Sequence, residues 1–162
     1  MKLKIQGIIK QSSVDGEGIR YVIFCQGCPH HCKGCHNPET WNFDGGVATP
    51  SDIRGQIIKA ISANGIERNF SVLGGEPLCE ENVAEVDNII TGVRSAYPDI
   101  KIYVWTGYYL SELLAQENPH IENILNHIDV LIDGRYVENE RDITLDLRGS
   151  RNQRILKKNI DF

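Results

Sequence analysis

Short β-rich runs alternate with amphipathic segments along most of this chain of 162 residues. β-Branched and aromatic residues predict strands at residues 20–24, 69–73, 100–105 and 128–132. Apolar residues spaced three and four apart predict helices at residues 51–63, 82–96 and, with an interruption near Pro119, 110–126. Strands and helices that alternate at this spacing form a parallel sheet with right-handed crossovers. The pattern therefore predicts an α/β fold.

Four segments follow the predicted strands directly. They are the cysteine-rich loop after residue 24 and residues 74–77, 106–108 and 133–135. Parallel strands end at one edge of a sheet, where such folds place their active sites. We therefore expect the four segments to converge on one rim. Beyond Tyr136 the chain is polar, with one candidate strand at 153–156 whose position the sequence leaves open.

Length and charge limit the classes of protein that fit. We expect one domain over residues 1–162, because a chain of this size buries a core without disulfides. The formal net charge of −5 argues against a protein that mainly grips nucleic acid. No apolar run reaches the length of a membrane span, and the N-terminus lacks the pattern of a signal peptide. We therefore expect no membrane contact and a cytoplasmic location.

Three cysteines and three histidines fall within the stretch CPHHCKGCHN at 28–37. In a reducing compartment, clustered cysteines favour metal binding or catalysis over disulfides, and the odd total of five agrees with this. Cys28, Cys32 and Cys35 have the spacing C-x-x-x-C-x-x-C. They fit a zinc site with a histidine as fourth ligand, a redox pair, or an iron–sulfur cluster with one open iron. Spacing alone leaves these alternatives open.

The cysteine spacing after the first predicted strand and the stretch GGEP at 74–77 together resemble the radical S-adenosylmethionine (SAM) superfamily. The resemblance implies a [4Fe-4S] cluster, with an open iron that chelates SAM, held by Cys28, Cys32 and Cys35. It also implies that the amino group of SAM is received by Gly74, Gly75 and Glu76. Glycines let the backbone approach a ligand closely, and a carboxylate matches an ammonium.

The same resemblance makes Gly34 and His36 further SAM contacts. The superfamily usually has an aromatic residue at the position of His36. We expect His30 and His31 to be exposed loop residues between the cluster ligands. Two further thiols are expected to lie outside the cluster, as a buried apolar residue and an incidental neighbour of the loop: Cys79 and Cys25.

Six stretches, in the same order and over nearly the whole chain, resemble the activating proteins of anaerobic ribonucleoside-triphosphate reductase. They are VDGEGIR (14–20), CHNPETW (35–41), LGGEPL (73–78), VWTGY (104–108), VLIDGR (130–135) and RGSRNQ (148–153). With the predicted strands, the resemblance implies a partial (β/α) barrel of the radical SAM type, open at one side, with mainly parallel strands. It implies an activase that cleaves SAM reductively and uses the 5′-deoxyadenosyl radical to make a glycyl radical on the reductase.

The partners implied are the large subunit of the reductase, as protein substrate, and reduced flavodoxin or a similar electron donor. An activase dimer or a reductase–activase heterotetramer is the assembly to expect. Two alternatives stay within the superfamily: an activase of another glycyl-radical enzyme, and a small enzyme that acts on a metabolite. A third alternative is a non-enzymatic zinc module that binds a partner.

Overall fold

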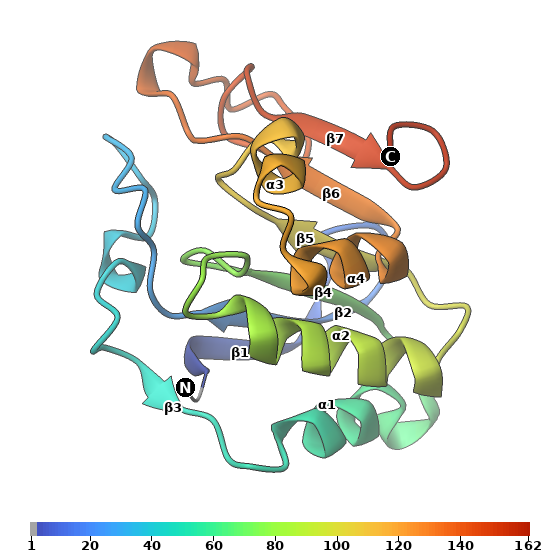
Figure 1. Cartoon of the computed structure of the whole chain (residues 1–162). Coiled ribbons are helices and arrows are strands. Elements are labelled where there is room, and N and C mark those ends of the chain that lie inside the picture. The colour runs from blue at the N-terminus through green and yellow to red at the C-terminus, as the bar shows by residue number, and fades with distance from the viewer. Residues whose placement is uncertain (1–2) are drawn as a thin grey trace.

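The computed structural model describes residues 3–162, in which seven strands form one sheet in the order β3-β1-β2-β4-β5-β6-β7 (Figure 1). The strands are β1 (Lys4–Ser12), β2 (Arg20–Cys25), β3 (Val47–Ala48), β4 (Asn69–Gly74), β5 (Ile102–Trp105), β6 (Val130–Asp133) and β7 (Arg154–Lys157). The α-helices are α1 (Ile53–Ile61), α2 (Val83–Ala96), α3 (Leu110–Ala115) and α4 (Pro119–His127). Short 3₁₀ helices span Pro38–Thr40, Ala63–Gly65 and Glu138–Glu140. The predicted α/β class is confirmed.

The four strands predicted from the sequence form the parallel centre of this sheet. β2, β4, β5 and β6 pair in parallel with one another, in that order. β1 and β3 on one side, and β7 on the other, pair antiparallel. Among the described strands, β3 and β7 are the two edges, so the sheet is open. Parallel pairing is thus limited to the middle of a mixed sheet.

The sequence pattern does not predict β1 and β3, which both lie at one side of the sheet. β1 leaves Ile8 and Ile9 exposed at 37% and 42%, so its apolar residues do not alternate with polar ones. A register shift between Ile5 and Gly7 interrupts its pairing with β2. A bulged and partly exposed strand carries a weak period-two signal. β3 has two residues, too few for any period to be recognised.

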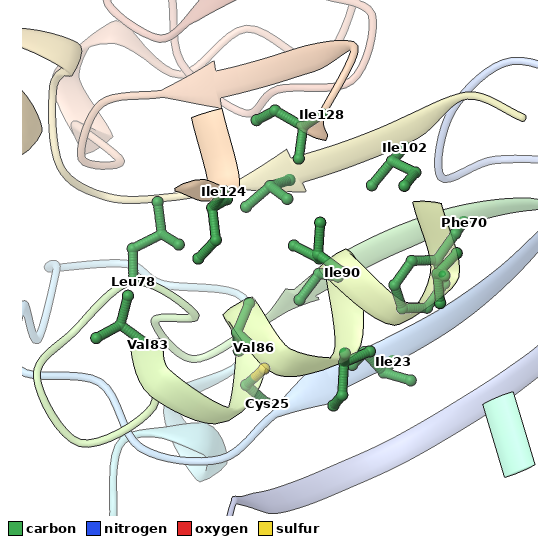
Figure 2. Packing of buried hydrophobic residues seen from close by; sticks show 14 of the residues in the cluster. Ile23, Cys25, Phe70, Leu78, Val83, Val86, Ile90, Ile102, Ile124 and Ile128 are labelled. Atoms are coloured by element: carbon green, nitrogen blue, oxygen red, sulfur yellow. The ribbon is translucent and has the colours of Figure 1, made fainter. Parts of the chain in front are cut away.

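Helices α1, α2 and α4 cover one face of the sheet, with α2 between the other two (Figure 1). The buried side of α2 consists of Val83, Val86, Ile89, Ile90 and Val93, the stripe expected from the helical period. Figure 2 shows Val83, Val86 and Ile90 of this stripe in one apolar core with the strand residues Ile23, Phe70 and Ile102. No helix within residues 3–162 combines the length and hydropathy that crossing a membrane requires.

The expected interruption near Pro119 separates α3 from α4. Pro119 is the first residue of α4, where its missing N–H costs nothing. The Asn118 side chain accepts a hydrogen bond from the backbone N–H of His120 and caps the new helix. The break lets α4 turn back onto the core, where Ile121, Ile124 and Leu125 are buried.

The other face of the sheet carries a smaller apolar cluster of Tyr103, Val130 and Ile132. The fully buried Arg20 lies beside it, with its guanidinium 4.0 Å from the centroid of the Tyr103 ring. Arg20 donates to the Ser71 hydroxyl at 2.6 Å and to the backbone oxygens of Phe70 and Lys101. Burial lowers the pKa of Arg20 to about 10. Through its hydrogen bonds, the guanidinium on β2 is joined to β4 and to the residue just before β5.

The polar tail returns to the sheet, which settles the position that the sequence leaves open. β7 pairs antiparallel with β6 and buries Leu156. The chain between β6 and β7 passes over the strand ends and returns (Figure 1). This path brings residues from the tail to the carboxyl edge of the parallel strands.

Replacing Ile90 with Ala should lower the free energy of unfolding by about 2–5 kcal/mol, because the side chain is fully buried and its loss leaves a cavity. The measurement is urea unfolding of the metal-free protein. Ile160→Ala is the matched control, since Ile160 is 78% exposed and its loss should change the free energy by less than about 0.5 kcal/mol. Equal effects of the two substitutions would contradict the core described above.

Candidate functional site

A cavity of about 380 Å³ opens at the carboxyl ends of the parallel strands. Each of the four segments that follow the predicted strands contributes to its wall, through residues that include Cys28, Gly75, Thr106 and Gly134. Parallel strands bring these loops together because they end at the same edge of the sheet. The prediction of one shared rim is confirmed.

The three cysteines of the C-x-x-x-C-x-x-C stretch all line this cavity. Cys28 is 8% exposed, and Cys32 and Cys35 are half-buried. Cys25 and Cys79 are buried and do not belong to the described residues that form the cavity wall. The fold thus separates three thiols at the cavity from two in the packed interior.

The loop that carries the three cysteines turns back between them. The N–H of Cys35 donates to the carbonyl oxygen of Cys32 at 3.1 Å. His31 and Gly34 have positive φ angles of 49° and 80°. The N–H of Asn37 lies 3.4 Å from the Cys35 sulfur. An N–H directed at sulfur stabilises a thiolate, so the loop suits a group that is bound through thiolates.

Burial disfavours bare thiolates at this wall. It raises the pKa of the Cys28 thiol to about 11, although the backbone N–H groups of His30 and His31 act in the opposite direction. Burial also raises the pKa of Cys32, against a backbone hydrogen bond from Tyr136. A metal bound to the sulfurs would supply the positive charge that the thiolates lack.

The donor set fits a cluster of several irons. No group of three or more His, Cys, Asp or Glu side chains within the described part of the chain has the geometry to hold a metal ion as it stands. An iron–sulfur cluster is wider than one ion, so its thiolate ligands surround it and do not meet at a point. Three cysteines spread along one cavity wall match this requirement.

Gly74 and Gly75 line the cavity where their backbone packs on the start of the cysteine loop. A Cβ atom at Gly74 would lie 2.3 Å from the nitrogen of Cys25, and one at Gly75 would lie 2.4 Å from the oxygen of Gly27. The N–H of Gly75 donates to Cys25 O, and that of Glu76 to Gly27 O, both at 2.8 Å. Larger side chains would force the two loops apart, so this contact requires both glycines.

Glu76 is fully buried behind the glycine loop, apart from the described residues that line the cavity. Its Oε1 accepts from the N–H of Leu78 at 2.9 Å and from the Thr106 hydroxyl at 2.8 Å. Its Oε2 accepts from the N–H of Gly107 at 2.7 Å and lies 2.8 Å from His30 Nε2. The resemblance implies a contact between Glu76 and the SAM amino group. Such a contact would require one of these four donors to leave.

His30 points inward, so the expectation that it is an exposed loop residue is wrong. Its side chain is 8% exposed, and its ring meets the Tyr108 ring edge-on with centroids 4.6 Å apart. A hydrogen bond to a buried carboxylate holds the imidazole more strongly than water does. His31 is exposed as expected and stacks on Trp41.

His36 and Gly34 are exposed residues at the rim, beside Tyr136. His36 lines the cavity, whereas Gly34 is outside the set of described wall residues. The His36 and Tyr136 rings lie with centroids 5.4 Å apart. A Cβ atom at Gly34, where φ is +80°, would lie 3.2 Å from Tyr136 and Glu138. Tyr136 thus places an aromatic ring next to His36, at the position where the resemblance leads to the expectation of an aromatic residue.

The tail supplies cavity residues whose place the sequence does not reveal: Tyr136, Leu147, Arg148, Gly149 and Gln153. Trp105 Nε1 donates to Leu147 O at 2.7 Å and fixes the segment over the end of β5. The Gln153 side chain accepts from the N–H of Gly149 and donates to Gly134 O. The stretch RGSRNQ contains the signal for this arrangement, since its glutamine joins the tail to the loop after β6.

The segment before β2 completes the wall through Val14 and Asp15. The Ser71 hydroxyl donates to Asp15 O at 2.7 Å, and the Ser12 hydroxyl donates to Asp15 Oδ2 at 2.6 Å. Ser71 in turn accepts from Arg20, the buried arginine of the sheet. The polar chain from Arg20 to Asp15 therefore fixes this segment at the cavity.

Comparison with known proteins identifies the family. The family model described as a 4Fe-4S single cluster domain matches residues 14–156. An anaerobic ribonucleoside-triphosphate reductase-activating protein of Haemophilus influenzae is 40% identical over 141 residues, which cover 86% of this chain and 88% of the relative. The chain belongs to the family of anaerobic ribonucleoside-triphosphate reductase-activating proteins. Relatives with the same name from Escherichia coli K12 and Enterobacteria phage T4 are 37% and 34% identical, over 86% and 88% of this chain and 89% and 86% of their own lengths.

Membership of this family bears on the three alternatives for the cysteine stretch. The matched residues 14–156 include every segment that lines the cavity, from Val14 to Gln153. A 4Fe-4S domain agrees with three thiols at one wall. The family and the geometry therefore both favour an iron–sulfur cluster over a zinc site or a redox pair.

The metal-free protein should lose stability as the pH rises above about 9, the ordinary pKa of a thiol. Burial raises the pKa of Cys28 to about 11 and that of Cys79 to about 12, and it raises the pKa of Cys25 as well. The unfolded chain then releases thiol protons at a lower pH than the folded chain, so alkali favours unfolding. Urea unfolding under reducing conditions at about pH 8 and about pH 10 measures the loss. Cys79→Ala should reduce the loss of unfolding free energy between these two pH values. An unchanged loss would contradict a raised pKa for the Cys79 thiol.

Proposed function

We propose that this protein activates anaerobic ribonucleoside-triphosphate reductase by generating a glycyl radical on it through radical SAM chemistry. The observation that carries the proposal is the convergence of Cys28, Cys32 and Cys35 on one cavity in a chain of this family. The relatives are named as activating proteins of that reductase. Their names and the cavity together support the reductase, rather than a metabolite or another enzyme, as the substrate.

The proposed cofactor is a [4Fe-4S] cluster held by Cys28, Cys32 and Cys35, with SAM as the co-substrate. When bound and reduced, this cluster would supply one electron for cleavage of SAM into methionine and a 5′-deoxyadenosyl radical, and that radical would take a hydrogen atom from a glycine Cα of the reductase. The protein would hold and orient these groups. The half-buried thiols, the N–H directed at the Cys35 sulfur and the cavity of about 380 Å³ support this assignment.

SAM is proposed to lie against the glycine loop and the rim. Gly74 and Gly75 present backbone to the cavity, which suits a close contact with the methionine part of the ligand. His36 and Tyr136 place two rings at the opposite end of the cysteine stretch, where an adenine can stack. Gly34 keeps the loop close to Tyr136. Glu76 is proposed to act on the amino group, directly or through the loops that it joins.

The architecture proposed for this domain, residues 1–162, is the open, partial barrel of the radical SAM type. A parallel centre with its cavity at the carboxyl edge and an open side supports it. An open side suits a macromolecular substrate, because a peptide loop must reach the cavity. Further parts of the proposal are a cytoplasmic location, reduced flavodoxin as electron donor, and assembly as a dimer or as a heterotetramer with the reductase.

Replacing any of Cys28, Cys32 or Cys35 with Ala should abolish iron binding and SAM cleavage together, by at least about a hundredfold in rate, because each would remove one cluster ligand. The measurements are iron content after anaerobic reconstitution and methionine released on reduction. Cys79→Ala and Cys25→Ala are controls that should keep the iron. A colourless protein that binds zinc and is inert toward SAM would exclude the proposal.

Mixing the reduced holoenzyme with the reductase and SAM should give the doublet of a glycyl radical in the electron paramagnetic resonance spectrum. The signal should require SAM and an intact glycine in the reductase, because the hydrogen atom comes from its Cα. A reductase variant with that glycine replaced by Ala is the control. SAM cleavage without a protein radical would favour the alternative of an enzyme that acts on a metabolite.

A further inference from the structure

The loop between two of the cluster cysteines is attached to the interior through a residue without an assigned role. His30 lies between Cys28 and Cys32, and its side chain is 8% exposed. The neighbouring His31 is exposed and stacks on Trp41 at the surface. Two adjacent histidines of one loop therefore have opposite environments, and only the first reaches a buried acid.

The acid is Glu76, which joins three segments. It follows the glycine loop after β4, and its oxygens accept from Thr106 and Gly107 in the loop after β5. The same Oε2 that accepts from the N–H of Gly107 lies 2.8 Å from His30 Nε2. A carboxylate accepts and does not donate, so the imidazole N–H donates to it. His30 thus connects the cysteine loop to the loops after β4 and β5, which also line the cavity.

Residues of the loop after β5 pack closely around the His30 ring that contacts Glu76. A Cβ atom at Gly107 would lie 2.5 Å from the His30 ring, so the loop after β5 approaches as closely as a glycine permits. The Tyr108 ring covers the imidazole edge-on. Loss of the imidazole would leave Glu76 with one donor fewer in a fully buried place, and it would free the middle of the cysteine loop.

We propose that His30 is a positioning residue that acts through Glu76 to keep the cysteine loop in register with the loops after β4 and β5. The inference rests on the proposed function, since the cysteine loop and the glycine loop after β4 are the ones assigned to the cluster and to SAM. A cluster held by Cys28 and Cys32 would then keep a fixed place relative to Gly75 and Gly107, which line the same cavity. Affinity for SAM therefore depends on a residue that need not touch it.

The test compares His30→Ala, His30→Gln and the control His31→Ala. A glutamine amide can replace the imidazole N–H as the donor to Glu76, whereas alanine cannot. In the holoenzyme, His30→Ala should retain iron and bind SAM about tenfold more weakly, and His30→Gln should restore most of the affinity. The SAM-dependent change in the electron paramagnetic resonance spectrum of the reduced cluster reports binding without catalysis.

A second measurement on the metal-free protein needs neither cluster nor SAM. Hydrogen exchange at the amides of Gly107 and Tyr108 should become faster in His30→Ala, remain slow in His30→Gln, and be unchanged in His31→Ala. This loop is far from His30 in the sequence but contacts its ring. Slow exchange in His30→Gln, which restores a donor to Glu76 but not the imidazole ring, therefore separates coupling through Glu76 from loss of ring packing.

Three results would test the role of His30 and the proposed function separately. Unchanged SAM affinity and unchanged exchange in His30→Ala would overturn the inference. Loss of iron in both His30 variants would overturn it too, because the imidazole would then be required for cluster binding and not only for the position of the loop. If SAM does not change the spectrum of the unmodified holoenzyme, the proposed function fails. The hydrogen-exchange measurement then decides by itself whether His30 couples the cysteine loop to the loop after β5.

Discussion

The parallel pairing of β2, β4, β5 and β6 is the constraint on which the site depends. In this register Cys25 pairs with Gly74, and Trp105 pairs with Ile132, so adjacent strands end almost level with one another. The loops that follow therefore start at the same edge and share one cavity. An antiparallel arrangement of the same strands would send alternate loops to opposite ends of the sheet. The three thiols and the glycine loop would then not meet.

The buried Glu76 carboxylate adds a second constraint at that edge. A charge without solvent requires several donors, and here they come from the cysteine loop, the glycine loop and the loop after β5. Satisfying the acid therefore aligns three segments that are far apart in the sequence. The role implied by resemblance is contact with a ligand, whereas the observed bonds make Glu76 a joint between walls of the cavity.

Much of the fold follows from local pattern, and the exceptions have physical causes. The central strands and the helices packed on them have clear periods because one side of each is buried. The sequence pattern does not predict β1, because a strand that leaves Ile8 and Ile9 exposed lacks the alternation that burial imposes, and β3 is too short to show a period. The place of the tail could not be predicted for another reason. Gln153 and Leu147 are held at the cavity by hydrogen bonds to Gly134 and Trp105, and such long-range bonds leave no periodic pattern in the sequence.

The sequence by itself determined the α/β class, the three cysteines at the cavity and the family, because strand and helix periods and ligand spacing are local properties. The same properties could not reveal which histidine is buried. His30 and His31 are neighbours of one type, and only packing against Glu76 and Tyr108 distinguishes them. Tertiary structure also decided that Tyr136 stands beside His36. In both cases the partner lies far along the chain, so only folding brings the two groups together.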